Sequence, residues 1–352
     1  MNLAEISARV LAGERIGVDE ALVLWEEGDL PRLGMLADAI RKRLHPEPVV
    51  TYVIDRNINY TDICVSACKF CAFYKGPEDP AGSVLSQAEL GLKIEETQAL
   101  GGTQILLQGG LHPDLPLSFY EEMLRFIKGY GIHIHGFSPP EIDHFSQLSG
   151  LSPREVLVRL QAAGLDSMPG GGAEILVERV RRETSPRKCG AAQWLAIMAE
   201  AHALGMRTTA TMMFGHLESV AERLQHLAGV RELQDRTGGF TAFIPWPFQP
   251  DHTALAGLPK TTAFEYLKVL ALSRIFLDNV ANIQASWVTQ GPKIAQLALF
   301  FGANDFGSTM IEENVVAAAG VSFRLSEAEI RRLVEEAGFQ ARQRRMDYSL
   351  VI

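Results

Sequence analysis

The feature that most constrains the fold is an alternation of β-rich and helix-forming segments from residue 49 onward. Strand patterns recur about eight times, separated by amphipathic segments. This alternation predicts parallel βαβ units, which favour a closed (β/α)8 TIM-type barrel with functional loops at the carboxyl ends of its strands. An open doubly wound sheet is the alternative. The expected strands cover residues 49–54, 103–108, 132–137, 165–168, 207–214, 240–246, 281–287 and 301–305.

The chain is expected to have three parts. Residues 1–48 are predicted to form an N-terminal helical extension, because leucine and isoleucine recur there at three- and four-residue spacing. Residues 49–320 are predicted to form the barrel. Residues 321–352 are predicted to add a helix over 326–339 and a strand over 346–352, both packed on the barrel. No low-complexity linker divides these parts.

Three of the four cysteines lie close together, with the spacing C-x3-C-x2-C at Cys64, Cys68 and Cys71. Thiolates on one short loop suit an iron–sulfur cluster, and three of them leave one iron of a cubane open to another ligand. A structural zinc module is the alternative, although it would need a fourth Cys or His nearby, and the next histidine is His112. A redox pair would show C-x-x-C without the third thiol. Cys189 is expected to be a small buried residue.

Composition excludes several classes of protein. The net charge of −9 argues against non-specific nucleic-acid binding, and 47% hydrophobic residues in a chain of 352 argue against disorder. No stretch approaches the roughly 20 apolar residues of a membrane span, and the N-terminus does not resemble a signal peptide. Four cysteines do not form a disulfide framework. We therefore expect a cytoplasmic protein with no nucleic-acid or membrane partner.

Functional side chains are expected just after the predicted strands. Gln108, Gly109 and Gly110 end the second strand, where glycines would let a ligand approach the backbone closely; a tight turn is the alternative. The triple glycine at 170–172 lacks the pattern of a phosphate loop, which argues against a nucleotide triphosphate site. The histidines at 133 and 135 are more typical of hydrogen-bonded core or rim residues than of a metal pair.

The cysteine stretch after a first strand, with aromatic Phe70 before the last cysteine, resembles the radical S-adenosylmethionine (SAM) superfamily over roughly residues 49–320. The resemblance implies that the three cysteines hold a 4Fe–4S cluster, and that the amino and carboxylate groups of SAM occupy the open iron. Residues 211–218 match the superfamily's G-x-I-x-G-x-x-E stretch at Gly215 and Glu218. The cofactor-binding positions that the resemblance implies are Phe70, Gln108, Gly109, Gly110, Ser138, Glu218 and Ile244.

Longer strings resemble the cyclic dehypoxanthinyl futalosine synthases of the futalosine route to menaquinone, from about residue 50 to 345. Residues 137–142 (FSPPEI) and 244–250 (IPWPFQP) favour this family over its sister, the aminofutalosine synthases. Deazaflavin-forming synthases share the cysteine motif and are a further alternative. The resemblance implies that a 5′-deoxyadenosyl radical takes hydrogen from C4′ of the sugar of dehypoxanthine futalosine. The carbon radical would then close onto the carboxyphenyl ring.

Such a reaction has three further requirements. It needs an electron donor, expected to be of the flavodoxin or ferredoxin type. It needs a proton acceptor late in the cycle, and Glu141, Asp305 and His112 are candidates because they follow predicted strands. The substrate carboxylate is expected to meet a donor such as Ser, Thr, Gln or Arg.

Overall fold

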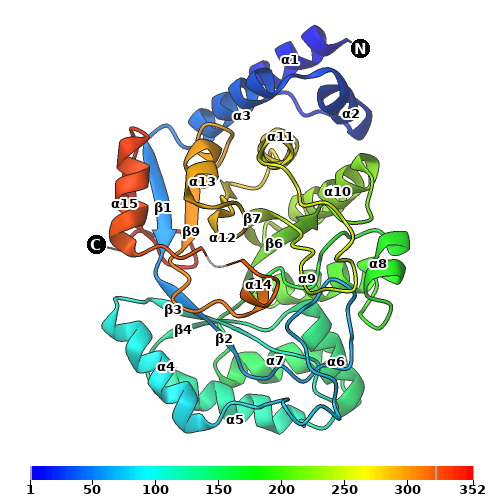
Figure 1. Ribbon diagram of the computed structural model, residues 1–352, viewed down its shortest axis with the longest axis vertical. Coiled ribbons are helices and arrows are strands. Elements are labelled where there is room, and N and C mark those ends of the chain that lie inside the picture. Colours follow the sequence, from blue (N-terminus) through cyan, green and yellow to red (C-terminus); the bar gives the residue numbers. More distant parts are fainter. Residues whose placement is uncertain (1, 322, 352) are drawn as a thin grey trace.

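The computed structural model describes residues 2–321 and 323–351, and it begins with three helices that lie together at one end of the molecule (Figure 1). Asn2 and Asp29 cap two of them by accepting hydrogen bonds from amides of the first turn. The third of these helices packs against α11 (Ala263–Phe276) through an apolar stripe that buries Leu33 and Leu36. The predicted helical N-terminus is therefore confirmed, as α1 (Leu3–Ala12), α2 (Val18–Glu27) and α3 (Leu30–Leu44).

Seven strands form one parallel sheet, and their order across the sheet is their order along the chain. Because every neighbouring pair is parallel, all seven carboxyl ends meet at one edge of the sheet. The predicted parallel α/β architecture is confirmed, as a curved half-barrel. Its strands are β2 (Asp55–Asn59), β3 (Gln104–Gln108), β4 (His133–Gly136), β5 (Ser167–Met168), β6 (Arg207–Phe214), β7 (Phe240–Pro247) and β8 (Asn282–Ile283).

Three more strands form a smaller sheet beside the half-barrel, in the order β10-β1-β9. The amide of Asn304 donates to the carbonyl of Ile283 at 3.1 Å, which joins this sheet to β8. The amide of Ile311 donates to the carbonyl of Asp55 at 3.2 Å, which brings the segment after β9 alongside β2. Backbone hydrogen bonds thus connect the smaller sheet to both edges of the half-barrel. Its strands are β1 (Val49–Val53), β9 (Asp305–Ser308) and β10 (Gln340–Gln343).

The predicted first strand, 49–54, was wrong in one respect, because the chain forms two strands there and the cysteine stretch follows the second. Asp55 and Asn57 of β2 are polar, yet only 4% and 5% exposed. A strand that directs polar side chains into a cavity has no apolar alternation to mark it in the sequence.

The end of the chain also differs from expectation. The strand predicted at 301–305 lies at 305–308, and the C-terminal strand predicted at 346–352 lies at 340–343, where it pairs with β1. The helix predicted at 326–339 is α15 (Glu327–Glu336). Residue 352 lies outside the described residues.

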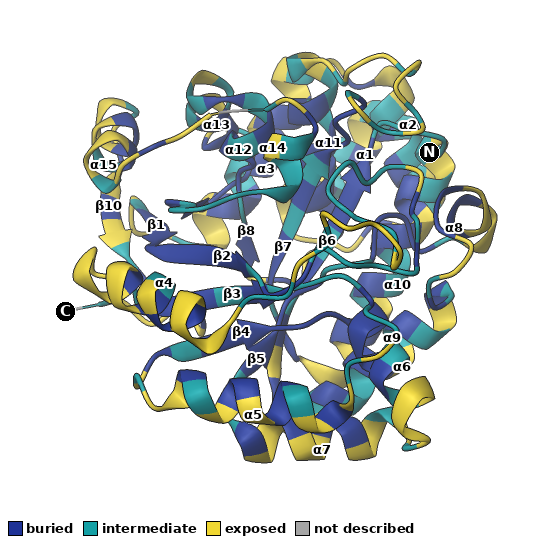
Figure 2. Ribbon diagram, turned by 60° about the horizontal axis from the view of Figure 1, so that its bottom comes forward, coloured by how far each residue is buried: buried dark blue, intermediate teal, exposed yellow. Residues whose placement is uncertain are grey.

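Helices cover the outside of the sheet, and Figure 2 shows their exposed faces turned away from the buried strands. Four begin with a serine that forms a capping box with a glutamate three residues on, at Ser86, Ser152, Ser219 and Ser326. No helix among residues 2–321 and 323–351 is long and apolar enough to cross a membrane. The remaining helices are α4 (Gln87–Ala99), α5 (Leu117–Lys128), α6 (Pro139–Ser149), α7 (Pro153–Ala163), α8 (Glu178–Thr184), α9 (Ala191–Ala203), α10 (Val220–Thr237), α12 (Trp287–Gln290), α13 (Pro292–Ala298) and α14 (Val315–Ala318).

Candidate active site

The loop that carries the cysteine motif follows β2 and is tied to three other segments by backbone hydrogen bonds. The amide of Cys64 donates to Lys75 at 2.9 Å, and that of Val65 donates to Leu111 at 3.0 Å. On its far side, the amide of Lys69 donates to the carbonyl of Thr184 at 2.8 Å. These anchors hold the loop beside the carboxyl end of β3, although it has no regular secondary structure of its own.

The three thiols of the motif are the donor set that a cubane with one open iron requires. Cys64 and Cys71 are half-buried and Cys68 is buried, and all three are free. Within the described ranges, no three His, Cys, Asp or Glu side chains are placed to hold a single metal ion. Each thiolate of a cubane binds a different iron, so a cluster does not require the three thiols to converge on one ion.

Two glycines at the end of β3 let the cysteine loop lie directly against the sheet. A Cβ on Gly109 would come within 2.6 Å of the Tyr60 ring. A Cβ on Gly110 would lie 2.7 Å from the carbonyl carbon of Ile63 and 2.9 Å from Cβ of Cys64. Any larger residue at either position would push the loop away. The strand end therefore forms a backbone cradle beside the cysteines, at the position where the sequence predicts a cofactor contact.

Glu141, a predicted proton acceptor, is buried behind this strand end. It accepts hydrogen bonds from the hydroxyls of Tyr60 at 2.8 Å and Ser138 at 2.5 Å, and from the amide of Gly109 at 3.1 Å. Burial raises the pKa of Glu141 to about 7, while its three donors oppose that rise. The carboxyl group thus helps to position the glycine cradle, and it can hold or release a proton near neutral pH.

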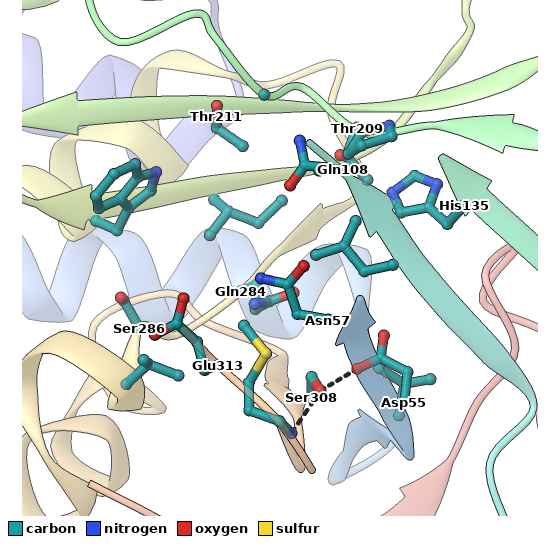
Figure 3. A pocket seen from close by; sticks show the side chains of 18 of the residues that line it. Asp55, Asn57, Gln108, His135, Thr209, Thr211, Gln284, Ser286, Ser308 and Glu313 are labelled. Atoms are coloured by element: carbon teal, nitrogen blue, oxygen red, sulfur yellow. Dashed lines mark hydrogen bonds between the residues drawn. The ribbon is translucent and has the colours of Figure 1, made fainter. Parts of the chain in front are cut away.

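A cavity of about 280 Å³ opens at the carboxyl ends of the strands and continues between them (Figure 3). One part of its wall is apolar and aromatic, with Ile244, Trp246, Trp287, Val288 and Met310. The other part is polar, and Figure 3 shows its side chains directed into the same space. The labelled polar residues are Asp55, Asn57, Gln108, His135, Thr209, Thr211, Gln284, Ser286, Ser308 and Glu313.

Of the predicted cofactor-binding residues, Gln108 and Ile244 line this cavity, whereas Glu218 does not. The Glu218 carboxylate is buried and accepts from the amides of Gly215 at 2.6 Å and His216 at 3.0 Å. It also pairs with Arg223 at 2.8 Å. These contacts give Glu218 the role of bracing the turn after β6.

The other two predicted proton acceptors also lie outside the cavity wall. Asp305 is buried and forms a two-pronged ion pair with Arg344, at 2.5 and 3.0 Å, while the Thr51 hydroxyl donates to it at 2.5 Å. His112 lies on the loop after β3, where its Nδ1 accepts from the amide of Asp114 at 3.1 Å. These contacts make Asp305 a structural partner of Arg344.

A half-buried lysine lies beside the cysteine loop, and sequence reasoning missed it. The Lys188 ammonium lies 3.0 Å from the Glu174 carboxylate and 5.0 Å from the centre of the Phe70 ring. The Cys68 thiolate and Glu174 raise the pKa of Lys188 against its burial. No periodicity or motif marks this residue, because the loop after α8 brings it to the site.

Sequence reasoning also missed most of the polar wall. Asn57, Gln284 and Glu313 come from β2, from the end of β8 and from the segment before α14. The one available signal was the run of alternate polar residues in β2, at Asp55, Asn57 and Asn59. The prediction that the two histidines are hydrogen-bonded core or rim residues is borne out, since buried His135 and half-buried His133 both contact the Ser167 hydroxyl, at 2.8 and 2.7 Å.

Comparison with known proteins decides the family. The pattern of the radical SAM superfamily matches residues 58–228, and that of the CofH/MqnC C-terminal region matches residues 237–351. The chain is 46% identical to the cyclic dehypoxanthine futalosine synthase of Halalkalibacterium halodurans, over 100% of this chain and 95% of that protein. The chain belongs to the radical SAM superfamily. Radical SAM enzymes use a 4Fe–4S cluster and SAM, and the three thiols beside the glycine cradle suit both.

Other relatives place this radical SAM chain among proteins of more than one activity. It is 46% identical to the cyclic dehypoxanthine futalosine synthase of Streptomyces coelicolor, over 100% of this chain and 89% of that protein. It is 41% identical to the 5-amino-6-(D-ribitylamino)uracil–L-tyrosine 4-hydroxyphenyl transferase of Methanoculleus marisnigri, over 99% of this chain and 98% of that protein. The fold is shared with the FeFe-hydrogenase maturase HydG from Carboxydothermus hydrogenoformans, with a TM-score of 0.78 at 19% identity over 98% of this chain and 80% of that one.

Proposed function

We propose that this radical SAM enzyme cyclises dehypoxanthine futalosine to cyclic dehypoxanthinyl futalosine. Two relatives with that named activity support the proposal, each 46% identical to this chain over its whole length. When bound, the cluster and SAM would supply a 5′-deoxyadenosyl radical that removes hydrogen from C4′ of the sugar. A flavodoxin- or ferredoxin-type protein is proposed as the electron donor.

The observation that carries the proposal is the division of the cavity wall. A substrate made of a sugar joined to a carboxyphenyl group needs a polar and an aromatic environment in one enclosure. Trp246 and Trp287 offer faces for the ring, and Asn57 and Gln284 offer amides for the polar part. Holding the two parts of one molecule at fixed positions favours ring closure by proximity, which requires no acid or base.

The cavity wall also supplies a carboxyl group for the late proton. Glu313 lines the cavity, whereas Glu141, Asp305 and His112 do not. Burial raises the pKa of Glu313, although it accepts hydrogen bonds from amides of the α14 turn, among them that of Val316 at 2.8 Å. We propose that Glu313 accepts the proton that the cyclised radical loses together with one electron, which would return to the oxidised cluster, and that Glu313→Gln lowers kcat while leaving substrate KM nearly unchanged.

The transferase activity is the second candidate, because relatives with that name are 38% to 45% identical to this chain. That reaction would join a tyrosine-derived ring to a ribityl-bearing uracil, so it also pairs an aromatic group with a hydroxylated chain. The two cyclic dehypoxanthine futalosine synthases are more similar, at 46% identity over the whole chain, which ranks the transferase second.

The deciding experiment uses anaerobically purified, cluster-loaded enzyme with SAM and a chemical reductant. One reaction contains dehypoxanthine futalosine, and the other contains L-tyrosine with 5-amino-6-(D-ribitylamino)uracil. The proposal expects the cyclised product in the first reaction and only 5′-deoxyadenosine background in the second. A coupled product in the second reaction alone would replace the cyclase proposal with the transferase.

A further inference from the structure

Four uncharged amide side chains line the inner part of the cavity, and we call them the amide cluster. They are Asn57 on β2, Gln104 and Gln108 on β3, and Gln284 at the end of β8. The cluster therefore draws on strands that lie at opposite edges of the seven-stranded sheet. Figure 3 shows Asn57, Gln108 and Gln284 directed into one space, with His135 and Thr209 beside them.

The amide cluster has hydrogen-bonding capacity that the protein leaves unused. Asn57 and Gln104 are 5% and 4% exposed, and each has a buried amide oxygen with no partner in the described parts of the chain. The side chains of Gln108 and Gln284 form no hydrogen bond with any described residue. An unmet buried polar group costs about 1–3 kcal/mol, so a group of them in one cavity indicates a site for a polar ligand.

Two glycines make room for the glutamines of the cluster. A Cβ on Gly171 would overlap the amide nitrogen of Gln108. A Cβ on Gly307 would lie 2.7 Å from the amide nitrogen of Gln284, and Gly307 has a φ of +91°, which other residues rarely adopt. Backbone of the loop after β5 and of strand β9 is thus shaped around these side chains. The side chains of Gln108 and Gln284 are thus held in place by packing, although they form no hydrogen bond with any described residue, whereas the side-chain nitrogen of Gln104 donates to Asp55 at 2.8 Å.

The chemistry of the cluster suits hydroxyl groups better than a carboxylate. An amide side chain both donates and accepts, as a hydroxyl does, whereas a carboxylate only accepts and would leave the oxygens of Asn57 and Gln104 unmet. The nearby guanidinium of Arg344 is already paired with Asp305.

We propose that Asn57, Gln104 and Gln284 of the amide cluster bind the pentose hydroxyl groups of the substrate, which fixes the sugar at the inner end of the cavity, whereas Gln108 keeps the cofactor-binding position expected of it at the end of β3. The inference rests on the proposed cyclase function and names the part of the substrate that each wall holds. The carboxyphenyl ring then lies against the apolar wall, near Trp246 and Trp287. Asn57 and Gln284 act as specificity-determining residues.

The test replaces each amide by an apolar group of similar size, as Asn57→Leu and Gln284→Met. Each change should raise KM for dehypoxanthine futalosine about 10- to 100-fold. Because each removes an unpaired polar group, Tm should stay unchanged or rise, which a structural role would not produce. Gln161→Met is the matched control, since Gln161 lies on the exposed surface of α7, away from the cavity.

Substrate analogues show whether the amide cluster binds the sugar or the carboxylate of the substrate. For an analogue lacking one pentose hydroxyl, the wild-type enzyme should lose affinity and Gln284→Met should lose little more, because the two changes remove the same hydrogen bond. A carboxamide in place of the carboxylate should leave the penalty of Gln284→Met intact. Wild-type KM in both variants, or a penalty that disappears with the carboxamide, overturns the inference. Absence of cyclised product from the wild-type enzyme overturns the proposed function, and this inference with it.

Discussion

Gly110→Ala tests whether the end of β3 positions the cysteine loop. The new methyl carbon would lie 2.7 Å from the carbonyl carbon of Ile63 and 2.9 Å from Cβ of Cys64. Ordinary carbon–carbon contact needs about 3.5–4.0 Å, so the loop must move by roughly 1 Å. The neighbours are backbone and the first cysteine itself, and no flexible side chain can move instead. Overpacking of this kind typically destabilises a protein by about 1–3 kcal/mol.

The same displacement predicts the loss of activity. A misplacement of about 1 Å can lower an enzyme's rate about 100-fold, so Gly110→Ala should form 5′-deoxyadenosine about 100-fold more slowly than wild type. The assay follows 5′-deoxyadenosine by chromatography, with iron and sulfide measured on the same anaerobic samples. Gly76→Ala is the control, because Gly76 lies next to the loop and nothing stands within 4 Å of its added methyl group. If Gly110→Ala had the iron content and the rate of the wild type, the end of β3 would not position the cysteine loop.

Three further predictions concern charge and ligation. Cys68→Ala should abolish cofactor cleavage and lower iron content, whereas Cys189→Ala should retain both; cleavage in Cys68→Ala would show that the ligand assignment is wrong. Because the pKa of Glu141 is about 7 in the folded protein and near 4.5 when unfolded, stability should fall by up to about 3 kcal/mol as pH rises through this interval. In urea unfolding at several pH values, Glu141→Gln should flatten the dependence of the free energy of unfolding on pH. A variant whose stability falls with pH as steeply as that of the wild type would contradict the assignment to Glu141. Asp305→Asn should destabilise the protein by about 3–5 kcal/mol, since it leaves Arg344 buried and unpaired, and adding Arg344→Met should recover part of that loss. Additive effects in urea unfolding would show that the two residues are not coupled.

The sequence predicts the outer architecture well, because covering helices and core strands repeat a strong apolar pattern. Ser86 illustrates this, since a serine before an amphipathic run and a glutamate three residues on predict the start of α4 at the residue where it occurs. Local chemistry is enough for such elements. Strand β2 shows the opposite case: Asp55 and Asn57 face a cavity, so the strand carries no apolar signal.

The site was predictable where a motif is contiguous and not where distant segments meet. The cysteine spacing alone indicates the cluster ligands. The ion pair between Asp305 and Arg344 joins β9 to the segment after β10, and no sequence pattern connects these residues. The prediction of Asp305 as a proton acceptor rested on its place after a strand, and nothing in the sequence indicated that it pairs with Arg344. Gln284 was likewise indistinguishable from a surface residue.

The pairing of β10 with β1 has a consequence for how the protein matures. Val50 lies opposite Ala341, and Met346 and Tyr348 lie at the cavity wall with Val53 and Asp55. A ribosome that adds about 5–20 residues per second needs on the order of 15–60 s between these two parts of the chain. Throughout that interval strand β1 lacks the neighbour that β10 later provides. The residues near 340–348 thus complete the cavity after the segment near residue 50 has been synthesised. Until then that early segment stays incompletely packed, and it is the part of the chain most exposed to chaperones during a delay in translation.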